Sequence, residues 1–172
     1  MDRKIQRKEM IREAFLFLLK FNLLLIPFYA IIHFDVDFYP FQTFFAKSIV
    51  FVLNGLGLRA HNIDFFVYAG NNNFPIDISR DCIGWKSVYS LFAMVIASPG
   101  KFKDKGRFLL IWLPIMLLIN IFRVFSTIFV GFLFGFHLME FVHTVIWQSL
   151  VVLIIIGVWC LYIRKSYFKV KR

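Results

Sequence analysis

Long apolar stretches separated by short basic blocks are the feature that most limits what this chain can fold into. The 172 residues are 60% hydrophobic and 20% aromatic, with 24 Phe, and the mean hydropathy is +0.73. A water-soluble domain of this length could not bury so many apolar side chains, because its surface would then consist largely of Phe and Leu. The bilayer supplies the missing apolar solvent. The composition therefore predicts an integral membrane protein and disfavours a soluble one.

Most of the Lys and Arg residues, which give the chain its net charge of +10, fall in three blocks. Met1–Lys20 holds six of them, Lys101–Arg107 four and Arg164–Arg172 five, with only four acidic residues in the three blocks together. The polar middle, Phe34–Asp81, holds three bases and five acids. This distribution is typical of cytoplasmic ends and loops in a membrane protein, not of a nucleic-acid-binding surface. We expect the basic blocks to contact anionic membrane lipids.

Four apolar stretches are candidates for crossing the bilayer, which takes about 20 residues. Three reach that length, namely Ala14–His33, Phe108–Gly131 and Phe141–Ile163. The fourth, Ser87–Gly100, does so only if its helix is extended back to about Arg80. We therefore predict an all-α integral membrane protein with about four transmembrane helices, in which residues 1–172 form a single transmembrane domain.

A further apolar stretch, Phe41–Leu58, is interrupted by Lys47 and Asn54. If it crossed the bilayer, the two later basic blocks would lie outside, against the charge bias. We therefore predict an interfacial or re-entrant helix there, with residues 1–13 and 164–172 as cytoplasmic ends of a multi-pass cell-membrane protein. Residues 34–81 would form an outer-face insertion, in which the pattern around the Asn-rich turn predicts a small β-hairpin at Ile63–Ser79.

Polar side chains from three predicted helices reach a similar depth on the outer side. Cys82 would open the third helix, and Arg123 would lie about 22 Å up the next one at 1.5 Å per residue. His143 is near the outer start of the last helix. Ionisable residues inside a membrane are costly and commonly functional. A helix N-terminus with Lys86 one turn on would favour a thiolate at Cys82, whereas Cys160 is expected to be a packing residue.

His143 has a competitor in His137, a short way upstream. Glu140 and Trp147 share the helix face of His143 at i−3 and i+4, so Glu140 is placed to orient the imidazole.

The other polar residues also have structural alternatives. Lys86 could be an interfacial anchor beside Trp85, and Arg123 could pair with an acidic residue or with helix carbonyls. The motifs of serine hydrolases, zinc peptidases, P-loop proteins and dithiol redox proteins are absent from the sequence. No ligand spacing supports a metal site, so no metal or cofactor is predicted.

The order Cys-x-Gly, then Asn-x-x-Arg, then His in three consecutive helices resembles the exosortase/archaeosortase family of membrane-embedded cysteine transpeptidases. The matching residues are Asp81-Cys82-Ile83-Gly84, Asn120-Ile121-Phe122-Arg123-Val124 and His143, within Ile78–Trp147. Two departures stand out: Ile83 replaces the small or hydroxyl residue common in the family, and many members are longer.

The resemblance implies cleavage of membrane-anchored surface-protein precursors near a C-terminal sorting signal, made of a short motif, a transmembrane helix and a basic tail. Cys82 would attack the scissile carbonyl on the outer face and form a thioester. Arg123 would stabilise the oxyanion or clamp the substrate, and His143 would shuttle protons. The acceptor would be water or an amine, such as one on a lipid.

Five further residues would support these three: Asp81, Gly84, Lys86, Asn120 and Glu140. Among them, Gly84 would leave the helix surface bare for a substrate backbone. The alternative class of protein is a non-catalytic membrane scaffold in which the Cys/Arg/His cluster is structural. A small transporter subunit is less favoured, because four spans and one buried charge make a thin solute path.

Overall fold

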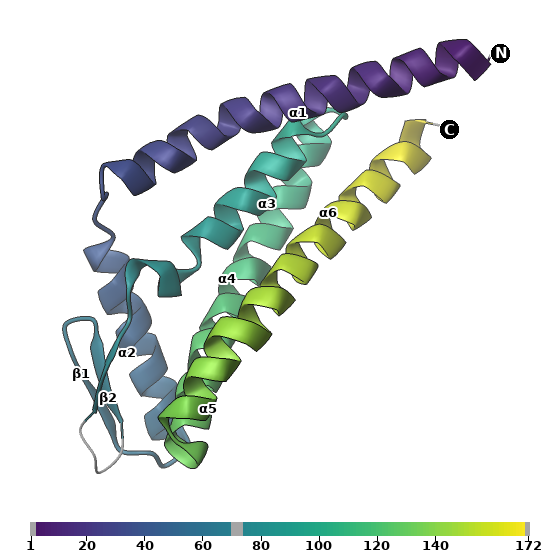
Figure 1. Cartoon of the computed structure of the whole chain (residues 1–172). Coiled ribbons are helices and arrows are strands. Elements are labelled where there is room, and N and C mark those ends of the chain that lie inside the picture. The colour runs from purple at the N-terminus through teal and green to yellow at the C-terminus, as the bar shows by residue number, and fades with distance from the viewer. Residues whose placement is uncertain (1–2, 70–73, 171–172) are drawn as a thin grey trace. The chain divides into compact units, whose positions relative to one another are not determined.

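The chain is mostly helical and carries a small sheet (Figure 1). A computed structural model describes residues 3–69 and 74–170. In chain order, the elements are α1 (Arg3–His33), α2 (Tyr39–Gly55), β1 (Ala60–Ile63), β2 (Phe66–Ala69), β3 (Phe74–Asp77), the 3₁₀-helix η1 (Arg80–Ile83), α3 (Trp85–Ala97), α4 (Phe102–Phe134), α5 (Phe136–Phe141), the π-helix η2 (Val142–Trp147) and α6 (Gln148–Val170).

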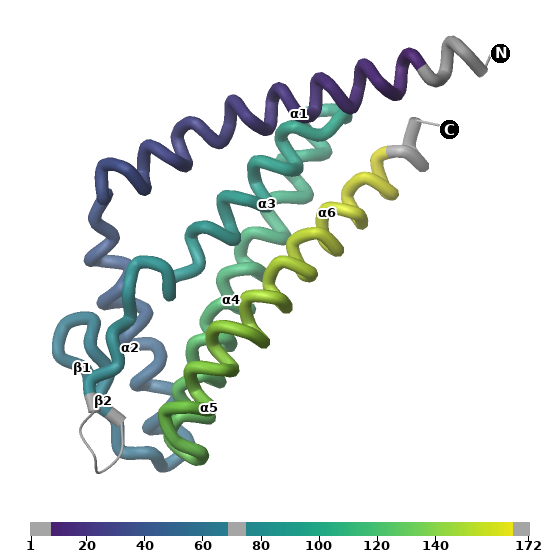
Figure 2. Tube along the Cα trace, viewed as in Figure 1, coloured from purple at the N-terminus to yellow at the C-terminus, as the bar shows by residue number. Residues whose placement is uncertain are grey.

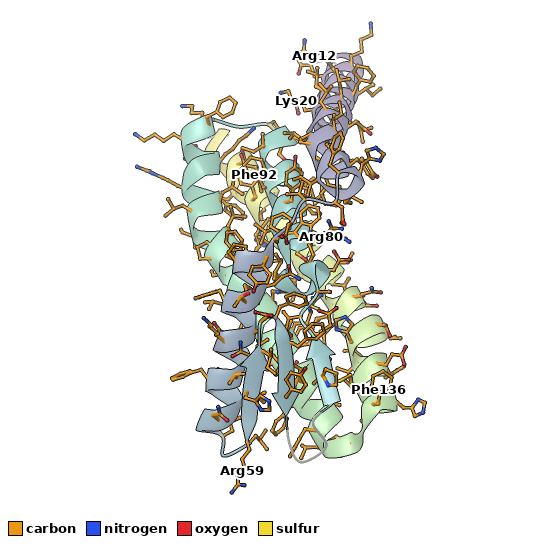
Figure 3. The ribbon with its side chains drawn as sticks, turned by 90° about the vertical axis from the view of Figure 1, so that its left-hand side faces the viewer. Arg12, Lys20, Arg59, Arg80, Phe92 and Phe136 are labelled. Atoms are coloured by element: carbon orange, nitrogen blue, oxygen red, sulfur yellow. The ribbon has the colours of Figure 1, made fainter. Side chains whose placement is uncertain are left out.

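Within the described residues, three helical segments are long and apolar enough to cross a membrane, namely Lys8–His33, Phe102–Phe134 and Phe136–Ser166. Each contains a predicted span and begins earlier than predicted. Helix α1 continues back into the basic N-terminal block, where Arg12 and Lys20 are exposed along it (Figure 3). Helix α3 is apolar but has only 13 residues, about 20 Å at 1.5 Å per residue.

The predicted continuous helix from about Arg80 to Gly100 is wrong. Gly84 adopts the left-handed conformation, with φ +77° and ψ 13°, and this ends η1. The backbone N–H groups of Ser87 and Val88 donate to the Gly84 carbonyl, so the α-helix begins after Gly84. Cys82 therefore precedes α3 and does not lie at its N-terminus.

The chain divides into two compact units. One consists of Met1–Val36, Tyr89–Leu113 and Ile155–Arg172, and the other of Asp37–Val88 and Pro114–Ile154. In the first unit, the end of α3 is fixed by side chains from other helices. Trp159 on α6 donates to the Ser98 hydroxyl at 2.8 Å, and the buried Lys105 on α4 donates to the Ile96 carbonyl at 2.7 Å.

The second unit holds an antiparallel sheet, which in the described part of the chain has three strands in the order β1-β2-β3. Ala60 faces Ala69 across β1 and β2, and Phe66 faces Asp77 across β2 and β3. The predicted hairpin is confirmed as β2 and β3, while its Asn-rich turn lies outside the described residues. Strand β1 was not predicted. The Asn54 side chain exchanges two hydrogen bonds, of 2.9 and 2.8 Å, with the backbone of Ala60 and so ties β1 to α2.

The apolar core of the second unit joins α2, the sheet, η1 and α4. Its buried side chains are Phe45, Ala46, Ile49, Leu53, Val67, Ile78, Ile83, Val124 and Ile128. The opposite side of α2 exposes Phe41, Phe44 and Phe51. Helix α2 occupies the predicted position of the interfacial or re-entrant helix, and its exposed side carries these Phe side chains together with Lys47.

Candidate active site

Cys82 lies in the η1 turn, immediately after the sheet. The Ile78 N–H donates to the Phe65 carbonyl at 3.1 Å, which extends the sheet one residue beyond β3. The buried Gln42 on α2 donates from Nε2 to the Ile78 carbonyl at 3.0 Å. The turn closes where the Cys82 N–H donates to the Ser79 carbonyl at 2.9 Å. The sheet and α2 therefore fix the chain a few residues before the cysteine.

Asn120 and Arg123 on α4 hold the carbonyl groups on either side of Cys82. Asn120 Nδ2 donates to the Cys82 carbonyl at 2.6 Å, and Arg123 Nη2 donates to the Asp81 carbonyl at 3.3 Å. Residues three apart share one face of a helix, so α4 presents both side chains to the turn. They are only 3% and 9% exposed. The predicted association of the Cys-x-Gly and Asn-x-x-Arg motifs is thus a direct contact.

Gly84 packs against the same asparagine. A Cβ atom at residue 84 would lie 2.4 Å from Asn120 Cγ, closer than real Cβ contacts allow. The Asn120 side chain therefore occupies the space beside Gly84 that was expected to stay bare for a substrate. Glycine is needed here for two reasons, the close approach of Asn120 and the positive φ angle.

The Arg123 guanidinium is incompletely satisfied. Its Nε is buried and has no hydrogen-bond partner within the described residues. Its charge interacts with Asp81 and with Cys82. A guanidinium carries five N–H donors, and a buried donor without a partner is costly. Arg123 therefore holds hydrogen-bonding capacity that its contact with the Asp81 carbonyl does not use.

His143 lies half-buried in η2, and its imidazole interacts electrostatically with Arg123. The buried Trp147, at the other end of η2, donates to Ser126 Oγ on α4 at 3.0 Å and so holds η2 against α4. The competing His137 is exposed on α5. The structure therefore brings His143 to the Arg123 side of the site, and π-helical segments are frequent at functional sites.

The expected contact between Glu140 and His143 is not present: no hydrogen bond joins the two side chains in the described part of the chain. Glu140 is exposed, and its backbone carbonyl accepts a hydrogen bond from Thr144.

The chain reverses just upstream at Gly135, between α4 and α5 (Figure 2), where φ is +89°.

Lys86 forms an ion pair with Asp81 rather than with Cys82. Its Nζ lies 2.7 Å from Asp81 Oδ2, and both side chains are well exposed. An exposed pair of this kind contributes at most about 1 kcal/mol to stability. Of the two predicted sources of thiolate stabilisation, Lys86 is thus paired with Asp81, while the N-terminus of α3 follows Cys82 by three residues.

The Cys82 sulfur contacts Ser79, a residue that the sequence did not single out. Ser79 Oγ lies 3.3 Å from Cys82 Sγ. Both cysteines are free thiols, Cys82 partly buried and Cys160 exposed. In residues 3–69 and 74–170, no group of three His, Cys, Asp or Glu side chains is placed to hold a metal ion.

The fold and this site define a membrane protein of several apolar helices, with a cysteine turn fastened to a buried arginine. The family model of the transmembrane exosortase matches residues 10–161, which include every residue of this site. The chain belongs to the transmembrane exosortase family, as the motifs predicted. No curated protein and no solved structure matches the chain.

We expect Gly84→Ala to destabilise the protein by about 1–3 kcal/mol, because it strains a left-handed position and drives a methyl group into Asn120. Thermal unfolding of the full chain in detergent would measure this. Gly106→Ala in α4 is the matched control, since its Cβ would meet no atom within 4 Å. In an Asn120→Ala background, the Gly84→Ala cost should shrink. Equal stability of the two single glycine variants would contradict the packing described here.

Proposed function

We propose that this protein is a cysteine transpeptidase or protease that cleaves surface-protein precursors near a C-terminal sorting signal. The observation that carries the proposal is the buried Arg123 guanidinium, which binds the peptide group next to Cys82 and keeps a buried Nε donor free within the described residues. A cysteine beside preorganised donors is the arrangement that acyl transfer requires. Membership of the transmembrane exosortase family supports this chemistry.

The proposed reaction begins with attack of the Cys82 thiolate on the scissile carbonyl carbon. The carbonyl oxygen becomes an oxyanion, which the Arg123 N–H groups stabilise. As the carbon–nitrogen bond breaks, His143 gives a proton to the leaving amine, and a thioester remains on Cys82. An amine, such as one on a lipid, or water then attacks the thioester, passes its proton to His143 and restores the thiolate.

Replacing Cys82 tests this proposal against the scaffold alternative. We expect Cys82→Ala to abolish cleavage of a co-expressed precursor that ends in a short motif, an apolar helix and a basic tail. The measurement is the size shift of the precursor on a gel. Cys160→Ala is the matched control and should process the precursor normally. Normal processing by a folded, membrane-inserted Cys82→Ala protein would leave only the scaffold function.

Arg123→Lys separates charge from geometry. Lysine keeps the positive charge but loses the planar fork of donors. We expect the processing rate to fall about 10²–10³-fold, the usual loss when an oxyanion donor is removed. The measurement is the time course of precursor cleavage at equal protein levels. A lysine variant as active as the wild type would exclude a role for the guanidinium geometry.

We also propose that α1, α3, α4 and the α5–α6 segment cross the membrane, with both termini cytoplasmic and the site facing outside. The support is the positive-inside bias of the three basic blocks. Single cysteines introduced at Lys101 and at Arg59, in a Cys82→Ala/Cys160→Ser background, would test it. We expect an impermeant maleimide added to intact cells to label residue 59 and not residue 101. Labelling of residue 101 would overturn this topology.

A further inference from the structure

We infer that Ser79 is a positioning residue that sets the reactivity of Cys82, by donating a hydrogen bond from its hydroxyl to the thiolate. The inference rests on the proposed role of Cys82 as the nucleophile. Ser79 Oγ lies 3.3 Å from Cys82 Sγ, within hydrogen-bond distance for sulfur, and both residues are partly buried.

The backbone holds the two side chains together. The Cys82 N–H donates to the Ser79 carbonyl at 2.9 Å and closes the turn between them. Upstream, Gln42 fixes the Ile78 carbonyl at 3.0 Å. Downstream, Asn120 fixes the carbonyl of Cys82 itself at 2.6 Å. The hydroxyl and the sulfur are therefore held close by contacts on both sides of the turn.

The Ser79 hydroxyl is also diverted from its usual local role. Ser79 is the N-cap residue of η1, a position where a serine oxygen commonly accepts a hydrogen bond from a backbone N–H of the first turn. In this structure its side chain makes no such capping bond. The hydroxyl lies 3.3 Å from the Cys82 sulfur instead. Capping the helix would not require this contact.

The chemistry fixes the direction of the hydrogen bond once the thiol is ionised. In the neutral pair, either the hydroxyl or the thiol can donate. A thiolate has no proton, so only the hydroxyl can donate to it, and hydrogen bonds to an ionised group are the stronger ones. The contact therefore favours the thiolate, the form that attacks a carbonyl.

Other charged groups near the turn do not replace this contact. Lys86 is paired with the Asp81 carboxylate, and Arg123 is bound to the Asp81 carbonyl while its charge interacts with the thiol. The charged groups on or beside the turn are Asp77, Arg80, Asp81 and Lys86, and the elements packed around it add Lys47 on α2, Arg123 on α4 and His143 on η2. All are retained when Ser79 is changed, so a comparison of Ser79 variants isolates the hydroxyl.

The experiment measures how fast iodoacetamide alkylates Cys82 as a function of pH. The full-length chain carrying Cys160→Ser is used in detergent, so that Cys82 is its only thiol. We expect Ser79→Ala to move the midpoint of the rate profile upward by about half to one pH unit, which is about a three- to tenfold lower rate below the midpoint. Ser79→Thr should keep the wild-type profile, since it retains the hydroxyl. Ser87→Ala, a serine on the first turn of α3, is the matched control and should also titrate as the wild type.

Two outcomes would overturn the inference: a Ser79→Ala profile that coincides with the wild type, or a Ser79→Thr profile that shifts as far as that of alanine. Ser79 has φ −59° and ψ 162°, which any residue adopts, so alanine is not expected to unfold the turn. Ser79→Gly provides a second variant without the hydroxyl and should shift like alanine. The readout needs no substrate, so a failed inference about Ser79 leaves the Cys82→Ala processing test of the proposed function unaffected.

Discussion

The hydrogen bond from Asn120 to the Cys82 carbonyl, with Gly84 packed beneath it, is the contact on which the site depends. It fastens the η1 turn to α4 at 2.6 Å, and it does so only because residue 84 has no Cβ. The left-handed Gly84 then determines where α3 begins. Arg123, one helical turn beyond Asn120, reaches the neighbouring carbonyl in consequence. One face of α4 thus sets both the position of the cysteine and the position of the charge beside it.

Burying a polar side chain in an apolar chain costs free energy unless the side chain finds a hydrogen-bond partner. The positions of the buried polar side chains therefore show where the fold needs such bonds. In the second unit, the buried polar side chains gather around η1, the turn that holds Cys82, on the helices α2 and α4. Gln42, Asn120 and Arg123 are buried, and each donates to a backbone carbonyl of the segment from Ile78 to Cys82. A short 3₁₀ turn pairs few of its own carbonyl groups, so it needs such donors when it packs against other elements. The same donors fix the backbone of the turn, which the proposed role of Cys82 would require.

The sequence was sufficient for the parts of this protein that depend on local pattern. Long apolar stretches predicted the helices, and the predicted topology placed Cys82 and Arg123 at a similar depth. The break before α3 could not be predicted, because the conformation of Gly84 is tied to Asn120, 36 residues away. Strand β1 was missed because its four residues, Ala-His-Asn-Ile, include two polar residues and only one β-branched residue. No sequence pattern pointed to three further polar residues of the second unit. Their partners are distant or atypical: the Cys82 sulfur for Ser79, the Ile78 carbonyl for Gln42 and the Trp147 indole for Ser126.

Ile83, the residue at which this chain departs from the common family motif, is explained by its burial. Its side chain is 4% exposed and belongs to the apolar core with Val67, Ile78 and Val124. A residue between the cysteine and the glycine therefore faces the sheet and α4 on this turn, while the sulfur of Cys82 faces Ser79. Isoleucine at this position packs the turn against its core, and each buried methylene stabilises the fold by roughly 1 kcal/mol. The departure thus alters the packing beneath Cys82 and leaves the proposed role of the cysteine unchanged.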